Sequence, residues 1–68
     1  MFTDAQLTED GWLVLLESNA TGAKVNELEL LLSDYKTIED ALNSNGYKLA
    51  GEWEEGYGGD KFADICAV

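Results

Sequence analysis

This chain cannot cross-link itself through sulfur or through metal, and that limits what it can fold into. Cys66 is its one cysteine and it has no histidine, so it can form neither an internal disulfide nor a zinc site of cysteines and histidines. A chain of 68 residues buries only about 60% of its unfolded surface, so its hydrophobic core is thin. We therefore expect one domain, residues 1–68, held by apolar packing, and a contribution from homo-oligomerisation or from a partner stays open.

The charge of the chain restricts its ligands. Fourteen acidic residues against four lysines give a formal net charge of −10. This charge repels nucleic acid phosphates and anionic lipids, so we expect no direct contact with nucleic acid or membrane. No apolar run has the length of a membrane span, and the acidic residues 1–10 do not have the pattern of a secretory or transit segment. These features predict a cytoplasmic domain.

Turn residues separate the first predicted strands. Asp10 and Gly11 both tolerate the positive φ of a type I′ turn, so they predict a hairpin, and the apolar run of residues 12–16 follows as a buried strand. Residues 19–22, with the sequence Asn-Ala-Thr-Gly, predict the next turn.

Residues 25–32 fit two kinds of secondary structure. A strand is indicated by the alternation of Leu28, Leu30 and Leu32 with Glu27, Glu29 and Leu31. A helix is indicated by the spacing of Val25, Leu28, Leu31 and Tyr35. The turn before this segment and the helix cap after it favour the strand, while its leucines and glutamates, which are good helix formers, keep the helix open.

The clearest helix runs from Asp34 to Asn45. Thr37 and Asp40 have the spacing of a capping box, and Gly46 ends the helix because glycine adopts the left-handed conformation without a steric penalty. One apolar face of this helix consists of Tyr35, Ile38, Ala41 and Leu42.

Two further strands complete the predicted sheet. Residues 47–54 alternate apolar with polar side chains and place Trp53 on the face of Leu49, in the core, and residues 62–68 return as a final strand after a glycine-rich loop. The chain is therefore predicted to be α+β: an antiparallel sheet of about four strands with one amphipathic helix on one face. The other face has no cover, and it is predicted to carry Glu27, Glu29, Glu52 and Glu54.

The residue types argue against catalysis. Without histidine the usual base for a Ser or Cys nucleophile is missing, and Cys66 lies beside Asp64, whose charge disfavours a thiolate. The glycines of residues 56–59 are not followed by the lysine of a phosphate-binding loop. Calcium ligands are present in Glu52, Glu54, Glu55, Asp60 and Asp64, but their spacing does not match an EF-hand. We expect no enzyme activity, no cofactor and no specific metal site.

The arrangement of the carboxylates is the remaining functional signal. Strand residues two apart share a face and lie about 6.6–6.8 Å apart, so Glu27 with Glu29 and Glu52 with Glu54 form two short rows of negative charge. Rows of this kind can imitate a nucleic acid backbone. The predicted partner-binding residues are these four with Glu39, Asp40, Glu55, Tyr57 and Asp60. Glu39 and Asp40 are expected to add charge from another side, on the helix, and Glu55 and Asp60 to assist from the glycine-rich loop.

In its shortness, its acidity and the segments Glu27-Leu28-Glu29 and Glu52-Trp53-Glu54-Glu55, the chain resembles small phage-type inhibitors. These include anti-CRISPR and anti-restriction proteins, some of which mimic nucleic acid. The resemblance implies an inhibitor in the host cytoplasm whose partner has a basic nucleic-acid-binding site, such as a Cas subunit or a restriction enzyme. The alternative is an accessory or structural protein-interaction module whose acidity serves only solubility.

Overall fold

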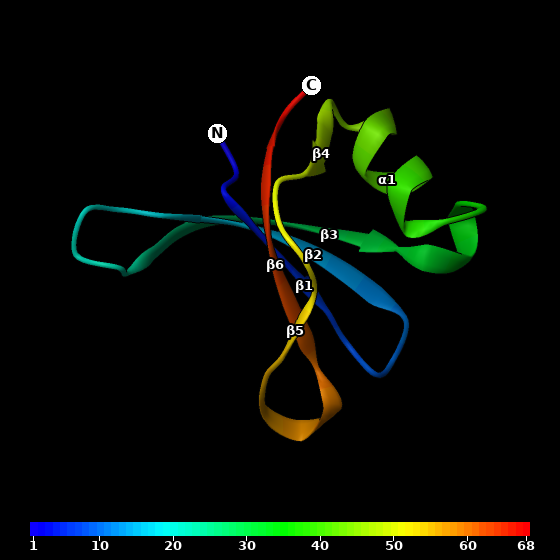
Figure 1. The fold of residues 1–68 in the computed structure, drawn as a ribbon, viewed down its shortest axis with the longest axis horizontal. Coiled ribbons are helices and arrows are strands. Elements are labelled where there is room, and N and C mark those ends of the chain that lie inside the picture. Colours follow the sequence, from blue (N-terminus) through cyan, green and yellow to red (C-terminus); the bar gives the residue numbers. More distant parts are fainter.

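Six strands form one antiparallel sheet, and one α-helix lies against one of its faces in the described chain (Figure 1). The computed structural model describes the backbone of residues 1–68 and every side chain except that of Tyr57. The strand order is β3-β2-β1-β6-β4, and β5 pairs with another part of β6. In chain order the elements are β1 (Asp4–Leu7), β2 (Trp12–Ser18), β3 (Lys24–Leu31), the 3-10 turn η1 (Leu32–Asp34), α1 (Ile38–Ser44), β4 (Tyr47–Leu49), β5 (Glu54–Glu55), the 3-10 turn η2 (Tyr57–Gly59) and β6 (Lys61–Ala67).

The α+β class is confirmed, but the predicted number of about four strands is too low. One additional strand is β1, the first arm of the hairpin at Gly11. The sequence pattern predicts the turn of this hairpin but does not identify its first arm as a strand. The other arises because the predicted strand 47–54 is interrupted. Leu49 opposes Ile65 and Glu54 opposes Phe62, so residues 50–53 span only residues 63 and 64 of β6. The extra length at residues 50–53 bends the chain and divides the predicted strand into β4 and β5.

The hairpin between β1 and β2 is confirmed, but its turn type differs from the prediction. Gly11 has φ +89°, and no residue other than glycine has a positive φ, so Asp10 does not adopt the left-handed conformation that a type I′ turn requires. The Gly11 amide donates to the Thr8 carbonyl at 3.3 Å and the Thr8 amide donates to the Trp12 carbonyl at 2.9 Å. These bonds close a three-residue loop whose one left-handed position is occupied by Gly11, which adopts this conformation without a steric cost.

Residues 25–31 lie in a strand as favoured, because β3 covers Lys24–Leu31 and pairs along β2, whereas Leu32 begins the 3-10 turn η1. The turn that joins β2 to β3 repeats the geometry of the first hairpin. Gly22 has φ +86° and donates to the Asn19 carbonyl at 3.0 Å. The Asn19 side-chain oxygen accepts from the Thr21 amide at 3.0 Å and the Ala23 amide at 3.1 Å, so one amide side chain holds the whole turn.

The helix α1 is shorter than predicted because its cap lies inside the predicted range. Tyr35 and Thr37 both have extended backbones, and the Thr37 hydroxyl accepts from the Asp40 amide at 3.0 Å, so the first helical residue is Ile38. At the other end Gly46 has φ +86°, as predicted for the stop. No helix in the described chain is long and apolar enough to cross a membrane.

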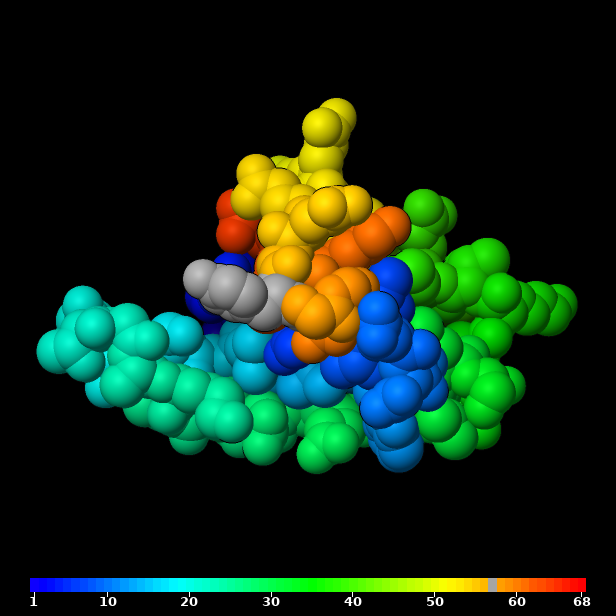
Figure 2. All heavy atoms as spheres, turned by 90° about the horizontal axis from the view of Figure 1, so that it is seen from below, coloured from blue at the N-terminus to red at the C-terminus, as the bar shows by residue number. Residues whose placement is uncertain are grey.

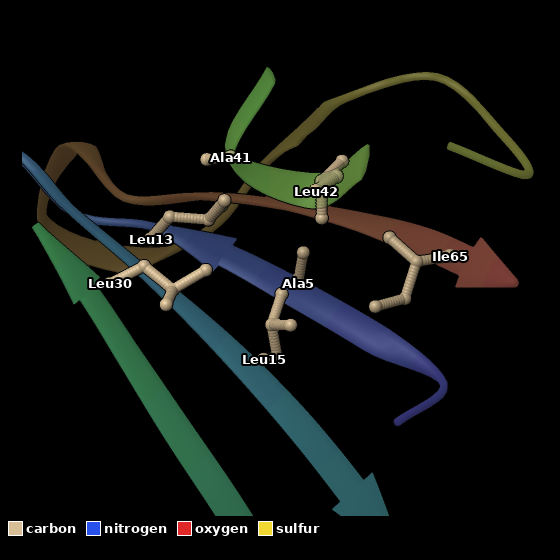
Figure 3. Packing of buried hydrophobic residues seen from close by; sticks show 7 residues of the cluster. All are labelled: Ala5, Leu13, Leu15, Leu30, Ala41, Leu42 and Ile65. Atoms are coloured by element: carbon tan, nitrogen blue, oxygen red, sulfur yellow. The ribbon is translucent and has the colours of Figure 1, made fainter. Parts of the chain in front are cut away.

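The core lies between α1 and the face of the sheet that α1 covers (Figure 3). Leu42 is fully buried and points from the helix toward strands β1, β2 and β6. Trp53 is partly buried and packs against this core, as predicted. The buried cluster consists of Ala5, Leu13, Leu15, Leu30, Ala41, Leu42 and Ile65. Its residues come from both ends of the chain, so the sheet and the helix depend on each other for stability.

Candidate protein-binding face

The face of the sheet opposite α1 carries the predicted strand glutamates. Directly opposed residues of antiparallel strands project to the same side of a sheet, and neighbours along a strand alternate between sides. Leu13 opposes Leu30 on the helix side, so Glu27 and Glu29 of β3 project to the other side. Glu54 projects there as well, because it opposes Phe62, the neighbour of Ala63 in β6. One uncovered face therefore carries glutamates at both of its margins.

Two aspartates stand between those margins. Asp4 of β1 opposes Leu16 on one side and Asp64 of β6 on the other. Directly opposed Cβ atoms lie about 4.5–5.5 Å apart, and like charges at that spacing destabilise a sheet. The Asp4 carboxylate accepts a hydrogen bond from the Thr3 hydroxyl at 3.2 Å, which does not neutralise either charge. The register thus concentrates negative charge at the centre of this face.

Glu52 adds a further carboxylate beside the two aspartates. It lies in the segment between β4 and β5 and is exposed. Together with Glu54 it borders an open cavity of about 340 Å³ on this side of the sheet. The cavity is lined by Asp4, Leu16, Gly51, Glu52, Glu54, Phe62, Ala63 and Asp64. We refer to the six carboxylate residues Asp4, Glu27, Glu29, Glu52, Glu54 and Asp64 as the acidic face.

Apolar side chains lie among these carboxylates. Trp12, which opposes Leu31, and Phe62 project to the same side, and all three are 37% exposed. The Phe62 ring lies so close to Gly56 that any side chain at position 56 would displace it, so this glycine sets the position of the ring. An apolar surface next to carboxylates lowers the local dielectric constant and strengthens their attraction for a cation.

Three predicted residues lie apart from the acidic face. Glu39 and Asp40 occupy the first turn of α1, on the covered side of the sheet, where they interact favourably with the helix dipole. Glu55 opposes Lys61, which also places it on the side of the helix. Glu39 and Asp40 therefore add negative charge from another side of the molecule than Glu27 and Glu29, as expected of helix residues, and Glu55, expected in a loop, lies in β5 on that side as well.

Asp60 has a structural contact of its own. The Gln6 side-chain amide donates to its carboxylate at 2.7 Å, and the Gly56 amide donates to its carbonyl at 2.8 Å. The β5–β6 turn (orange) therefore lies beside the β1–β2 turn (blue), as Figure 2 shows. The glycine-rich loop predicted for this segment is thus joined across its ends and to β1 by hydrogen bonds. The side chain of Tyr57, also predicted to bind a partner, lies outside the described part of the structure.

Cations contribute little to the acidic face. Among the described side chains, only Glu27 of the six carboxylates forms an ion pair, with Lys24 at 3.1 Å. Both partners are largely exposed, and such pairs contribute about 0–1 kcal/mol. No group of three or more described Asp, Glu or Cys side chains is arranged to hold a metal ion. The free charge of the face is therefore available to a cationic partner.

Sequence reasoning missed Asp4 and Asp64 as members of this surface. The alternation of Asp4 and Gln6 with Ala5 and Leu7 was the signal for a strand with one polar side, but four residues are too few to recognise without the partner strands. Comparisons with models of protein families, with curated proteins and with solved structures found no match to this chain.

Proposed function

We propose that this chain is a non-catalytic protein-binding domain that covers a basic nucleic-acid-binding site of another protein with its acidic face. In this role it acts as an inhibitor by charge mimicry. A Cas subunit or a restriction enzyme is the kind of partner that the resemblance to phage-type inhibitors implies. The observation that carries the proposal is the gathering of six carboxylates on the one face of the sheet that no helix covers.

The placement of the charges favours a role in binding over a role in solubility alone. Solubility requires only that charge be spread over the surface, and a net charge of about 2–8 is enough for a small domain. Asp4 instead opposes Asp64 directly, an arrangement that costs stability in a chain with a thin core. A partner that supplies positive charge would relieve this repulsion on binding.

The apolar residues of the face suit arginine and lysine side chains. An arginine stacks on an aromatic ring while its guanidinium binds a carboxylate, and lysine lays its methylene stem on apolar surface. Phe62 and Leu16 border the cavity that four carboxylates surround. A basic side chain of the partner can fill this cavity with its stem against the apolar wall and its charge among the carboxylates.

Competition tests the proposal directly. A basic nucleic-acid-binding protein that co-purifies with the chain from its host should release it when its own nucleic acid is added. The double variant Glu52→Gln with Glu54→Gln should bind more weakly and with a shallower salt dependence, because two charges of the acidic face are lost. The matched control, Glu39→Gln with Asp40→Asn, removes two charges from α1 and should bind as the unmodified chain does. A ternary complex of partner, nucleic acid and this chain, with each affinity unchanged, would refute direct mimicry.

A second candidate function rests on the apolar part of the same face. Trp12 and Leu31 are directly opposed and partly exposed, which is the geometry of a small apolar anchor for an accessory protein-interaction module. Such a module binds with little dependence on salt, and its affinity depends on Trp12 rather than on Glu52 and Glu54. Binding that Trp12→Ala abolishes and the double glutamine variant leaves unchanged would favour this candidate.

A further inference from the structure

The outer edge of β3 is the longest unpaired strand edge in the described chain. β3 has eight residues and stands at the end of the strand order, so it pairs only with β2. Residues 24–29 are all exposed. The β2–β3 hairpin extends away from the helix and the rest of the sheet (Figure 1), and no other described element pairs with its outer side. An edge of this kind presents backbone donors and acceptors to another strand.

The hydrogen bonds identify which residues face outward. The Leu32 amide donates to the Gly11 carbonyl at 3.0 Å, which makes this pair a hydrogen-bonded one. Hydrogen-bonded and non-hydrogen-bonded pairs alternate along antiparallel strands. Glu27, Glu29 and Leu31 therefore direct their amides and carbonyls away from β2. The Glu27 amide confirms this, because it is bonded to the Asn26 side-chain oxygen at 3.0 Å and not to β2.

The side chains along this edge are acidic on one face of the sheet and apolar on the other. Glu27 and Glu29 project onto the acidic face, whereas Leu28 projects to the helix side, where it is 37% exposed. A strand added in an antiparallel orientation would oppose each glutamate directly, within reach of an ion pair. It would also place an intervening residue beside Leu28. The edge is therefore complementary to a segment that alternates basic with apolar residues.

We propose that β3 receives an extended basic segment of the partner as an additional antiparallel strand. Lysine or arginine residues two apart oppose Glu27 and Glu29, and the apolar residue between them packs on Leu28. The proposal rests on the proposed function in one respect, because it takes the partner to be basic. It adds the secondary structure and the residue pattern of the segment that binds.

A second copy of this chain does not fit the same edge as an antiparallel strand. The outward residues of two β3 strands must oppose one another in any antiparallel pair. In every antiparallel register in which both Glu27 and Glu29 oppose a residue of the other copy's β3, at least one glutamate lies opposite a glutamate. Each copy also has a net charge of −10, so self-pairing adds to a general repulsion. Charge complementarity selects a basic partner over a homodimer.

Short peptides that alternate lysine and valine provide the test. In the proposed complex the lysines oppose the glutamates in hydrogen-bonded pairs, so it is their backbone amides that bond to β3. Methylation of the lysine backbone nitrogens should weaken binding by roughly tenfold or more, while methylation of the valine nitrogens should change it by less than about twofold. Titrations followed by NMR should show the Glu29 and Leu31 amides protected from exchange by the unmodified peptide.

A pair of protein variants separates backbone pairing from charge. Glu29→Gln removes one charge, and Glu29→Pro removes the same charge and the outward amide, which does not contribute to the β2 ladder. Proline should therefore weaken the peptide markedly more than glutamine does. Equal effects of the two methylated peptides, or no binding of any peptide, would overturn the edge proposal. Neither result affects the competition experiment with a nucleic-acid-binding partner, which decides the proposed function separately.

Discussion

Leu42 joins the helix to three strands of the sheet, and it shows what a single residue contributes in a thin core. Its side chain is fully buried, and it faces Ala5, Leu13 and Ile65 across the interface (Figure 3). A chain this short has few such residues, so each carries a large part of the hydrophobic stabilisation. The apolar face predicted for the helix placed this residue in the core.

Leu42→Ala is expected to lower the free energy of unfolding by about 2–5 kcal/mol, because truncation of a buried leucine loses transfer energy and leaves a cavity. Urea unfolding followed by tryptophan fluorescence measures this change. The same truncation at Leu28, which is 37% exposed, should cost less than about 2 kcal/mol. Equal losses at the two positions would mean that the core is not centred on Leu42.

At the scale of the element, the cap of α1 determines where the helix begins. Thr37→Ala removes the hydroxyl that accepts from the Asp40 amide and should cost about 0.5–2 kcal/mol of stability. Thr37→Ser retains the hydroxyl and should recover most of the loss. Thermal unfolding of both variants, followed by far-UV circular dichroism, provides the measurement. A serine variant as unstable as the alanine variant would indicate that the methyl group of Thr37, and not its hydroxyl, supports the helix.

The elements differ in how far the sequence alone could predict them. The cap at Thr37 and the stop at Gly46 act through local chemistry, so the helix was predicted, although its start at Asp34 overlooked the extended backbone that a cap requires. The alternation around Leu28 and Leu30 was enough to favour a strand. The division of residues 47–54 was not predictable, because it depends on the register with β6.

The candidate site shows the same limit. Its glutamates on β3 and β5 were predicted, because alternation within one strand assigns side chains to a face. The pairing of Asp4 with Asp64 was missed, since it joins two residues that only the sheet order brings together. Glu39 and Asp40 were expected on another side and lie there, whereas Glu55 was expected in a loop and lies in β5, because the register with β6 that forms this strand cannot be read from the sequence.

For the whole molecule, the unequal placement of charge predicts that replacing an aspartate by asparagine has opposite effects on stability at two positions. Asp64→Asn removes the charge opposite Asp4 and should raise stability by about 0.2–1 kcal/mol while it weakens partner binding. Asp40→Asn removes one negative charge, as Asp64→Asn does. It removes this charge from the first turn of α1, where the charge is favourable, and should lower stability by about 0.3–1 kcal/mol. Thermal unfolding at low salt compares them. Two changes of the same sign would show that net charge, not placement, controls stability.

The outward edge of β3 also bears on how the chain behaves when it is crowded. An open strand edge is a starting point for aggregation unless something guards it, and here the guards are Glu27 and Glu29. The same two carboxylates that would recruit a basic partner keep the chain from recruiting itself. A variant in which both glutamates are replaced by neutral residues would no longer attract a basic partner. It is therefore expected to assemble into oligomers or fibrils during expression.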